Sequence, residues 1–353
     1  MTVDQPRAVR PGEALDLESL GRYLRSIDPD LSGPIKLAQF RAGASNLTYL
    51  LEVGGRELVL RRPPHGRKAK SAHDMGREVR VLRALRDAYP YVPEVIAFCD
   101  DPGVLGGDFY VMERIKGIIL RKNLPKGLRL TREETARLCS NVIDKHIELH
   151  EVDYEAAGLG DLGRPEGYVQ RQVEGWSGRF RAARTPDAPS YERVMAWLAD
   201  NRPPEVGAAL IHGDFRFDNV VLDPDDPLRV IGVLDWEMAT LGDPLMDLGS
   251  SLAYWMQQGD PWLLRLMRVQ PTHLPGMMTR DQVVYYYCTR RGLEISSFDF
   301  YRIFGLFRLV VIMQQIYYRY HHRQTRTRRF GRFIWLIKYL EGYLERQIAA
   351  SRP

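Results

Sequence analysis

The chain has 353 residues, a formal net charge of +5 and an isoelectric point near 9.0. This length allows two domains or two lobes with a large core, and it excludes a small disulfide-stabilised scaffold. The three cysteines are widely spaced and lie outside any CxxC motif. They therefore predict buried thiols in a reducing compartment rather than a disulfide framework or a zinc site, and the basic charge permits anionic partners.

Residues 1 to 32 predict an N-terminal extension that leads into a first helix. The segment lacks the apolar stretch of a signal peptide, so we expect a cytoplasmic protein. The most apolar run, residues 304 to 316, is interrupted by Arg308, Gln314 and Gln315. It is too short and too polar for a membrane span, and it predicts a buried helix.

Residues 33 to 115 predict a small lobe built on an antiparallel sheet. Strand-like alternation occurs in five stretches, which are residues 35 to 40, 47 to 53, 58 to 61, 94 to 99 and 109 to 113. Gly54-Gly55 marks a hairpin between the second and third stretches. Apolar residues from Met75 to Leu85 recur every three or four positions, which predicts one helix before the last two strands.

From Thr131 onward the periodicity becomes helical. Thr131 is a favourable N-cap, and Glu133 and Glu134 follow in the first turn. Further helices are predicted at residues 188 to 200, 244 to 258, 279 to 291, 298 to 320 and 332 to 349. Residues 116 to 353 thus form a mainly helical second lobe, and the fold class is α+β.

The stretch LIHGDFRFDNVVL, residues 210 to 222, places polar groups between two strand-like runs. A further apolar run ends at Asp235, and neighbouring strands would bring Asp214, Asn219 and Asp235 to one end. Two carboxylates and an amide oxygen suit Mg²⁺. In the alternative interpretation, Asp214 and Asp218 cap turns and Asn219 forms an Asx-turn.

Neighbouring polar residues are given local roles. His212 is expected to buttress the loop through hydrogen bonds, and Arg216 and Asp218 are interpreted as a local ion pair without an assigned function. Asp243 and Asp247 are expected to cap and anchor the helix that follows.

The HxDxxxxN pattern followed by a strand-terminal Asp is the arrangement found in protein kinases. The motifs Ile211-His212-Gly213-Asp214, Asp218-Asn219, Leu234-Asp235-Trp236, Gly242-Asp243-Pro244 and Asp247-Leu248 resemble those of the aminoglycoside phosphotransferase-like, or choline-kinase-like, family. Residues 60 to 64, 71 to 74 and 77 to 82 are similar to the branch related to the kinase domains of acyl-CoA dehydrogenase fusion proteins. The resemblance implies a bilobal protein-kinase-like fold, ATP or GTP as phosphate donor, Mg²⁺, and a hydroxyl acceptor on a small molecule.

By this resemblance Asp214 is the catalytic base, and Asn219 and Asp235 are the metal ligands. The segment from Phe40 to Tyr49 lies between two strands, as a phosphate-covering loop should. Its nucleotide-binding candidates are Gly43, Ser45 and Asn46.

The chain departs from the kinase pattern at the strand that normally carries a phosphate-binding lysine. That strand ends in Arg61 and Arg62, and we choose Arg61 as the ion-pair partner of Glu78, since it lies one pleat period after Val59. The alternative is that Glu78 is a solvated acid paired within its own helix. Backbone groups near Glu113 and Ile115 are expected to bind the adenine ring.

The acceptor is suggested by residues 319 to 332, which are rich in arginine, contain no acid and follow several tyrosines. A basic, aromatic surface suits an anionic or CoA-linked hydroxy compound, whereas a cationic aminoglycoside would need carboxylates. A solvated turn is the alternative for this segment, and nucleic acid is disfavoured because no reading module is present. A nucleotide-binding pseudokinase or regulatory module without turnover is the second functional hypothesis, and the oligomeric state is left open.

Overall fold

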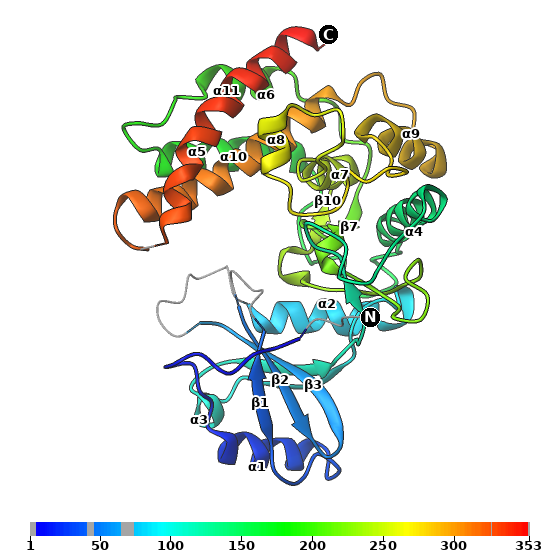
Figure 1. Ribbon diagram of the computed structural model, residues 1–353, viewed down its shortest axis with the longest axis vertical. Helices are drawn as coiled ribbons and strands as arrows, with labels where there is room; N and C mark the ends of the chain where they lie inside the picture. Colours follow the sequence, from blue (N-terminus) through cyan, green and yellow to red (C-terminus); the bar gives the residue numbers. More distant parts are fainter. Residues whose placement is uncertain (1–4, 41–45, 65–73, 326, 352–353) are drawn as a thin grey trace. The chain divides into compact units, whose positions relative to one another are not determined.

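The computed structural model describes residues 5–40, 46–64, 74–325 and 327–351 (Figure 1). The chain divides into two compact units. Unit 1 comprises Met1–Leu130, Asp153–Leu159 and Phe217–Ala239, and unit 2 comprises Thr131–Val152, Gly160–Arg216 and Thr240–Pro353.

Unit 1 is built on a five-stranded antiparallel sheet in the order β1-β2-β3-β5-β4. The strands are β1 Lys36–Gln39, β2 Leu47–Val53, β3 Arg56–Arg62, β4 Val95–Cys99 and β5 Phe109–Glu113. Three helices accompany them, α1 Leu17–Ile27, α2 Met75–Ala88 and the short α3 Pro102–Leu105. All five predicted strands and the predicted helix α2 are therefore confirmed, while α3, between β4 and β5, was not predicted.

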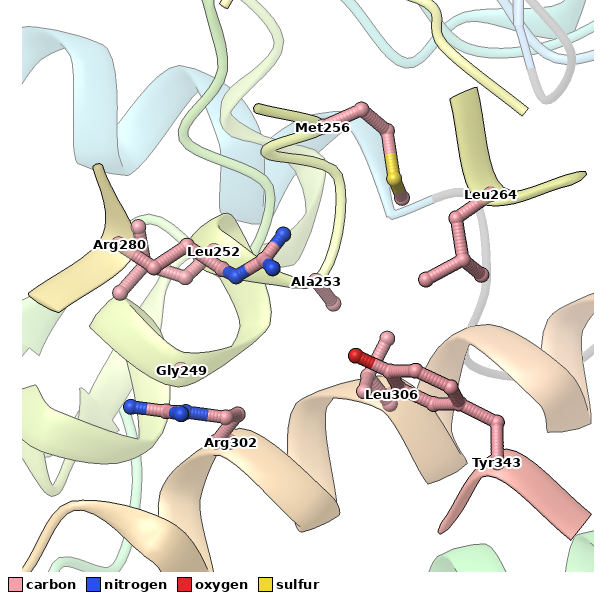
Figure 2. Close-up of a pocket in the computed structure, with 9 residues that line it drawn as sticks. All are labelled: Gly249, Leu252, Ala253, Met256, Leu264, Arg280, Arg302, Leu306 and Tyr343. Atoms are coloured by element: carbon pink, nitrogen blue, oxygen red, sulfur yellow. The ribbon is translucent and has the colours of Figure 1, made fainter. Parts of the chain in front are cut away.

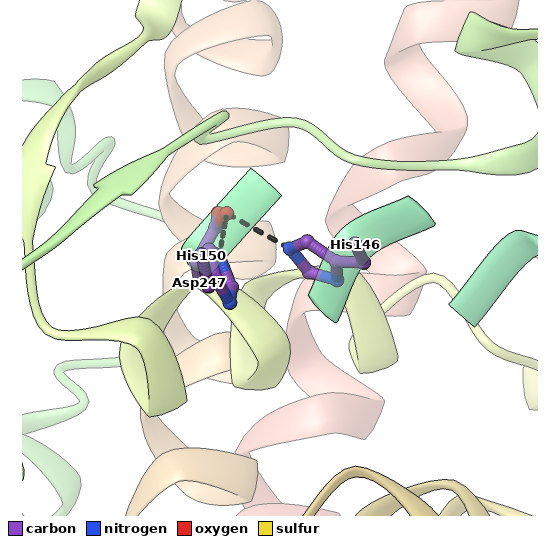
Figure 3. A group of neighbouring side chains, drawn as sticks. All are labelled: His146, His150 and Asp247. Atoms are coloured by element: carbon purple, nitrogen blue, oxygen red, sulfur yellow. Dashed lines mark hydrogen bonds and ion pairs between the residues drawn. The ribbon is translucent and has the colours of Figure 1, made fainter. Parts of the chain in front are cut away.

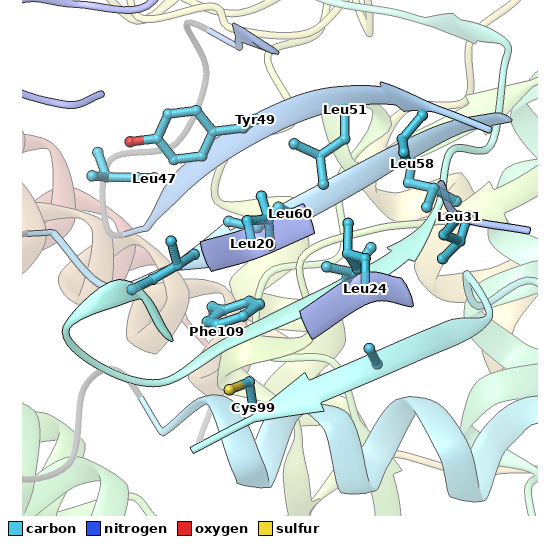
Figure 4. Close-up of a cluster of buried hydrophobic side chains, with 14 residues drawn as sticks. Leu20, Leu24, Leu31, Leu47, Tyr49, Leu51, Leu58, Leu60, Cys99 and Phe109 are labelled. Carbon is cyan, nitrogen blue, oxygen red and sulfur yellow. The ribbon is translucent and has the colours of Figure 1, made fainter. Parts of the chain in front are cut away.

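Strand alternation gives the sheet one strongly apolar face. Figure 4 shows Leu20 and Leu24 of α1 packed toward side chains of this face, among them Tyr49, Leu51 and Leu60. Because neighbouring residues of a strand point to opposite faces, Arg61 projects from the other side of β3 than Leu60 does. The core packing of unit 1 therefore fixes the direction of this arginine.

A second sheet of unit 1 combines distant parts of the chain in the order β6-β8-β9. Its strands are β6 Ile118–Ile119, β8 Val220–Leu222 and β9 Val230–Val233. The N–H of Val233 donates to the carbonyl of Tyr91 at 2.7 Å, and the 3-10 helix η2 Trp236–Met238 packs against α2. These contacts place Phe217–Ala239 in unit 1, although the sequence had suggested a helical lobe running without interruption from residue 116.

Unit 2 is mainly helical and contains one two-stranded sheet, β7 Ala209–Ile211 with β10 Thr240–Gly242. Its helices are α4 Arg132–His150, α5 Tyr168–Ala183, α6 Glu192–Asp200, α7 Pro244–Leu252, α8 Trp262–Leu266, α9 Arg280–Arg291, α10 Asp299–His321 and α11 Phe333–Ala350. Helix α4 begins with a capping box formed by Thr131 and Glu134, as the N-cap prediction required. Helix α10 packs against α5, α7 and α11.

Helices α7 and α10 cross at two glycines. A Cβ atom added to Gly305 would lie 2.1 Å from the carbonyl oxygen of Gly249, so the backbones approach too closely for any side chain. This crossing fixes α7, which carries residues of the candidate site, against the central helix of the unit.

Helices α5 and α8 were not predicted from the sequence. Helix α5 has no side-chain cap and contains Gly175 and Gly178, so its start signal and propensity are weak. Helix α6 begins only at Glu192, because Tyr191 adopts a left-handed conformation with φ of 57°.

The predicted buried helix at residues 304 to 316 lies within α10. Among the described residues, no helix combines the length and apolar character needed to cross a membrane. Cys99, Cys139 and Cys288 are all free and buried, as predicted.

Candidate active site

A buried cluster of charged side chains surrounds Arg61 in unit 1. Its Nη1 lies 2.7 Å from Glu78 Oε1, and its Nη2 lies 2.9 Å from Asp235 Oδ1 and 3.5 Å from Glu237 Oε2. The predicted pairing of Arg61 with Glu78 is therefore present. Arg62 occupies the opposite side of the strand, where its charge acts on Tyr49.

The electrostatics of this cluster follow from burial and charge count. Burial alone would lower the pKa of Arg61, but Tyr110 and the three neighbouring carboxyl groups raise it well above its usual value. Burial raises the pKa of Glu78, against the attraction of Arg61. Three carboxyl groups, those of Glu78, Asp235 and Glu237, thus gather around one guanidinium, and a concentration of carboxylates also suits a divalent cation.

Asn219 and Asp235 lie at the same end of the β8–β9 pair. Val220 is opposite Val233, and the N–H of Leu234 donates to the carbonyl of Asn219 at 2.8 Å. Asp235 has a φ of 72°, which is unusual for a residue with a Cβ, and its side chain is 37% exposed. An amide and a partly exposed carboxylate at one end of a strand pair are a donor set that fits Mg²⁺.

Of the remaining nucleotide-binding candidates, some are described by the structure and some lie outside the described residues. Asn46 is buried, and its Nδ2 donates to Glu237 Oε2 at 2.8 Å, which connects the end of the predicted phosphate loop to the charged cluster. Gly43 and Ser45 lie outside the described residues. Glu113 ends β5, where its N–H donates to the Glu94 carbonyl, and Ile115 follows in the loop toward β6.

In unit 2, the loop that carries Asp214 is held through its backbone. Asp247 accepts the N–H of His212 at 3.0 Å and that of Gly213 at 2.9 Å. The fully buried ring of His212 accepts the Asp214 N–H through Nδ1 at 3.2 Å, so the predicted buttressing role of His212 is confirmed. Arg308 of α10 donates to the Gly213 carbonyl at 2.7 Å.

Two histidines of α4 reach the same carboxylate (Figure 3). The Nε2 atoms of His146 and His150 lie 3.0 and 3.2 Å from Asp247 Oδ2. Although burial raises the pKa of Asp247, the hydrogen bonds from these rings hold it well below its usual value. Two histidines and an aspartate could bind a metal, but this carboxylate already accepts four N–H groups, so we interpret the cluster as a brace that joins α4, α7 and the Asp214 loop.

Asp243 caps α7 as expected, since it accepts the N–H groups of Leu245 and Met246. Arg216, which was predicted to pair with Asp218, forms an ion pair with Asp214, since its Nη2 lies 3.0 Å from Asp214 Oδ2. Asp214 and Arg216 belong to unit 2, whereas Asn219 and Asp235 belong to unit 1.

A small pocket in unit 2 is lined mainly by apolar side chains from α7, α8, α10 and α11 (Figure 2). Arg280 and Arg302 also line it, and Arg280 Nη1 lies 2.8 Å from Asp260 Oδ2.

The basic, aromatic surface expected near residue 320 is less aromatic than predicted. Tyr287 and Tyr317 are buried, with their hydroxyl groups bonded to His150 and Asp187.

Sequence reasoning missed Glu237, Arg308 and the two histidines of α4. His146 and His150 are four residues apart and continue the apolar stripe of Leu138 and Val142, and polar residues on a buried stripe were the available signal. Arg308 was noticed only as an interruption of an apolar run.

Comparison with known proteins agrees with this arrangement. The model of the phosphotransferase enzyme family, APH, matches residues 36–277. Acyl-CoA dehydrogenase family member 10 of Mus musculus is 37% identical over 320 residues, which cover 90% of this chain and 30% of that protein. Probable acyl-CoA dehydrogenase IBR3 of Arabidopsis thaliana is 34% identical, with 90% of this chain and 41% of that protein covered. The chain thus spans about 30% to 40% of the length of such relatives.

Among solved structures, a putative aminoglycoside phosphotransferase of Ralstonia eutropha has a TM-score of 0.78 and 30% identity, with 94% of this chain and 99% of that chain covered. Choline kinase of Cryptosporidium parvum has a TM-score of 0.61 at 12% identity, with 95% and 96% covered, and supports the fold alone. These neighbours confirm the predicted kinase-like α+β fold. The chain belongs to the phosphotransferase enzyme family.

Proposed function

We propose that this protein is a small-molecule kinase that transfers the terminal phosphoryl group of ATP or GTP to a hydroxyl group with the help of Mg²⁺. The observation that carries the proposal is the contact of Arg61 with both Glu78 and Asp235. An arginine held by a helix glutamate and by a candidate metal ligand is a cation suited to bind nucleotide phosphates.

Each residue then has a defined task. Asp214 orients the acceptor hydroxyl and takes its proton, and the braced backbone of residues 212 to 214 keeps that carboxylate in place. Asn219 and Asp235 would hold Mg²⁺, which neutralises phosphate charge when bound. Arg61 binds the donor phosphates, Asn46 with Gly43 and Ser45 covers them, and backbone groups near Glu113 and Ile115 receive the adenine.

For the acceptor we propose an anionic or CoA-linked hydroxy compound. The apolar pocket beside α7 suits a hydrocarbon chain, and its two charged lining residues are arginines rather than the carboxylates that a cationic aminoglycoside would require. The names of the relatives, which refer to acyl-CoA dehydrogenases, support the same class.

The test begins with thermal unfolding of the purified chain with ATP or GTP, each with and without Mg²⁺. Transfer of labelled phosphate is then measured on a panel of hydroxyacyl-CoAs, free hydroxy acids and aminoglycosides. We expect Mg²⁺-dependent stabilisation and transfer to an anionic acceptor. Mg²⁺-dependent binding without transfer to any acceptor would instead favour the nucleotide-binding pseudokinase, and transfer only to aminoglycosides would refute the proposed acceptor class.

A further inference from the structure

Arg216 is two residues beyond the proposed base and touches it. Its Nη2 lies 3.0 Å from Asp214 Oδ2, and the two side chains are 18% and 21% exposed. The guanidinium carbon stands 4.5 Å from the centre of the Tyr254 ring, in a cation–π contact. Between the two charged residues, Phe215 is buried and stacked on His146, and its carbonyl accepts the hydroxyl of Ser251. The buried Phe215 therefore anchors the loop. The side chains of Asp214 and Arg216, on either side of it, form an ion pair with each other.

We propose that Arg216 is a second catalytic cation, which binds the phosphoryl group as it reaches the hydroxyl held by Asp214. This inference rests on the proposed phosphotransfer function. In that reaction the hydroxyl proton passes to Asp214, the acceptor oxygen bonds to phosphorus, and the bond from phosphorus to the nucleotide oxygen breaks to release the nucleoside diphosphate. A group in contact with the Asp214 carboxylate is consequently next to the oxygen that attacks phosphorus.

The chemistry of arginine suits this place. Its planar guanidinium offers five N–H donors, so it can contact a carboxylate and a phosphoryl oxygen at the same time. Charge on the transferred group is spread over its equatorial oxygens, and a fixed cation beside them stabilises that charge without reorganisation. The ring of Tyr254 restricts the plane of the guanidinium and so preorganises it.

The contacts of the loop argue against a purely structural role for Arg216, because other residues already hold its backbone. The backbone of residues 212 to 215 is already held by Asp247, His212, Arg308 and Ser251. The Arg216 side chain instead binds the carboxylate of Asp214, which is partly exposed.

The experiment compares Arg216→Gln and Arg216→Lys with wild type, and Arg181→Gln serves as a control. Arg181 forms a bidentate ion pair with Glu192 on the exposed side of α5 and α6, away from the loop contacts. Arg216→Gln should lower kcat about 10²-fold or more while changing KM for the nucleotide less than about threefold. Arg216→Lys should recover part of kcat because it restores the charge, and the melting temperatures of all variants should agree.

A second readout needs neither the acceptor nor turnover. Calorimetry measures the affinity for ADP with Mg²⁺, alone and with aluminium fluoride, which mimics the phosphoryl group in transfer. Arg216→Gln should weaken aluminium fluoride-dependent binding at least tenfold and leave ADP binding unchanged. Equal aluminium fluoride-dependent binding in wild type and Arg216→Gln overturns the role of Arg216, whereas a wild type that transfers no phosphate to any acceptor refutes the proposed function.

Discussion

Acidification should destabilise the protein through His150, which is fully buried in the brace around Asp247. Its Nδ1 lies 2.7 Å from the Tyr287 hydroxyl and its Nε2 lies 3.2 Å from Asp247 Oδ2. Burial, with the nearby His146, lowers the pKa of His150 to about 3, although Asp247 acts in the opposite direction. The unfolded chain therefore binds a proton near the ordinary histidine pKa of about 6.5, while the folded protein does not. Stability from this group is present above that pH and is lost as the pH falls toward 3.

The magnitude follows from proton linkage. One proton bound only by the unfolded chain costs about 1.4 kcal/mol per pH unit, so lowering the pH from 7 to 5 should cost about 2 kcal/mol after the titration begins near 6.5. Guanidinium unfolding at pH 7, 6 and 5 measures this for wild type and for His150→Gln. The exposed His322→Gln serves as the control.

We expect His150→Gln to be less stable at pH 7 but to lose about 2 kcal/mol less than wild type on acidification to pH 5. The control should retain the wild-type pH dependence. Identical pH dependence in wild type and His150→Gln would refute the assignment of a neutral, buried His150.

Three further predictions concern the site and its support. Glu78→Gln should reduce kcat/KM for the nucleotide about tenfold or more, since Arg61 loses a carboxylate 2.7 Å away; steady-state kinetics unchanged by the substitution would speak against that ion pair as a phosphate-positioning element. Asp247→Asn should lower the free energy of unfolding by about 3–5 kcal/mol, because two histidines and two backbone N–H groups lose a charged acceptor. A loss below about 1 kcal/mol in denaturant titrations would contradict the interpretation of this cluster as a brace. Gly305→Ala should lower the free energy of unfolding by more than about 2 kcal/mol, because the added Cβ would clash at the α7–α10 crossing. The control Gly342→Ala, whose Cβ would meet only the flexible end of Arg346, should be neutral or stabilising by up to about 1 kcal/mol. Equal shifts of the two variants in calorimetry would disprove the tight crossing.

The sheet of unit 1 could be predicted well because its strands alternate and its hairpin contains Gly54-Gly55. The same alternation selected Arg61 over Arg62, since the two residues leave opposite faces of β3. Helix α4 was recognisable from Thr131, whose capping box is a local signal. Helix α5 has no such signal, and its position depends on packing against α10.

The site could not be predicted fully, because its short strands pair with segments that lie far apart in the sequence. The sequence placed two short strands around the Asp214 loop, but β7 pairs with β10 in unit 2 whereas β8 pairs with β6 and β9 in unit 1. No local pattern distinguishes these partners, because all five strands are short and apolar. For the same reason the contact of Arg216 with Asp214 was not foreseen. In an irregular loop the sequence does not tell whether the side chain of Arg216 reaches Asp214.

The central claim is that Asp214 accepts the proton of the acceptor hydroxyl while the residues of unit 1 bind the nucleotide. The most direct measurement compares Asp214→Asn with wild type for phosphate transfer and, by calorimetry, for binding of the nucleotide with Mg²⁺. We predict that transfer falls at least about 10³-fold, within the range of general-base catalysis, while the Kd for the nucleotide changes less than about threefold. Transfer at the wild-type rate by Asp214→Asn would contradict the account.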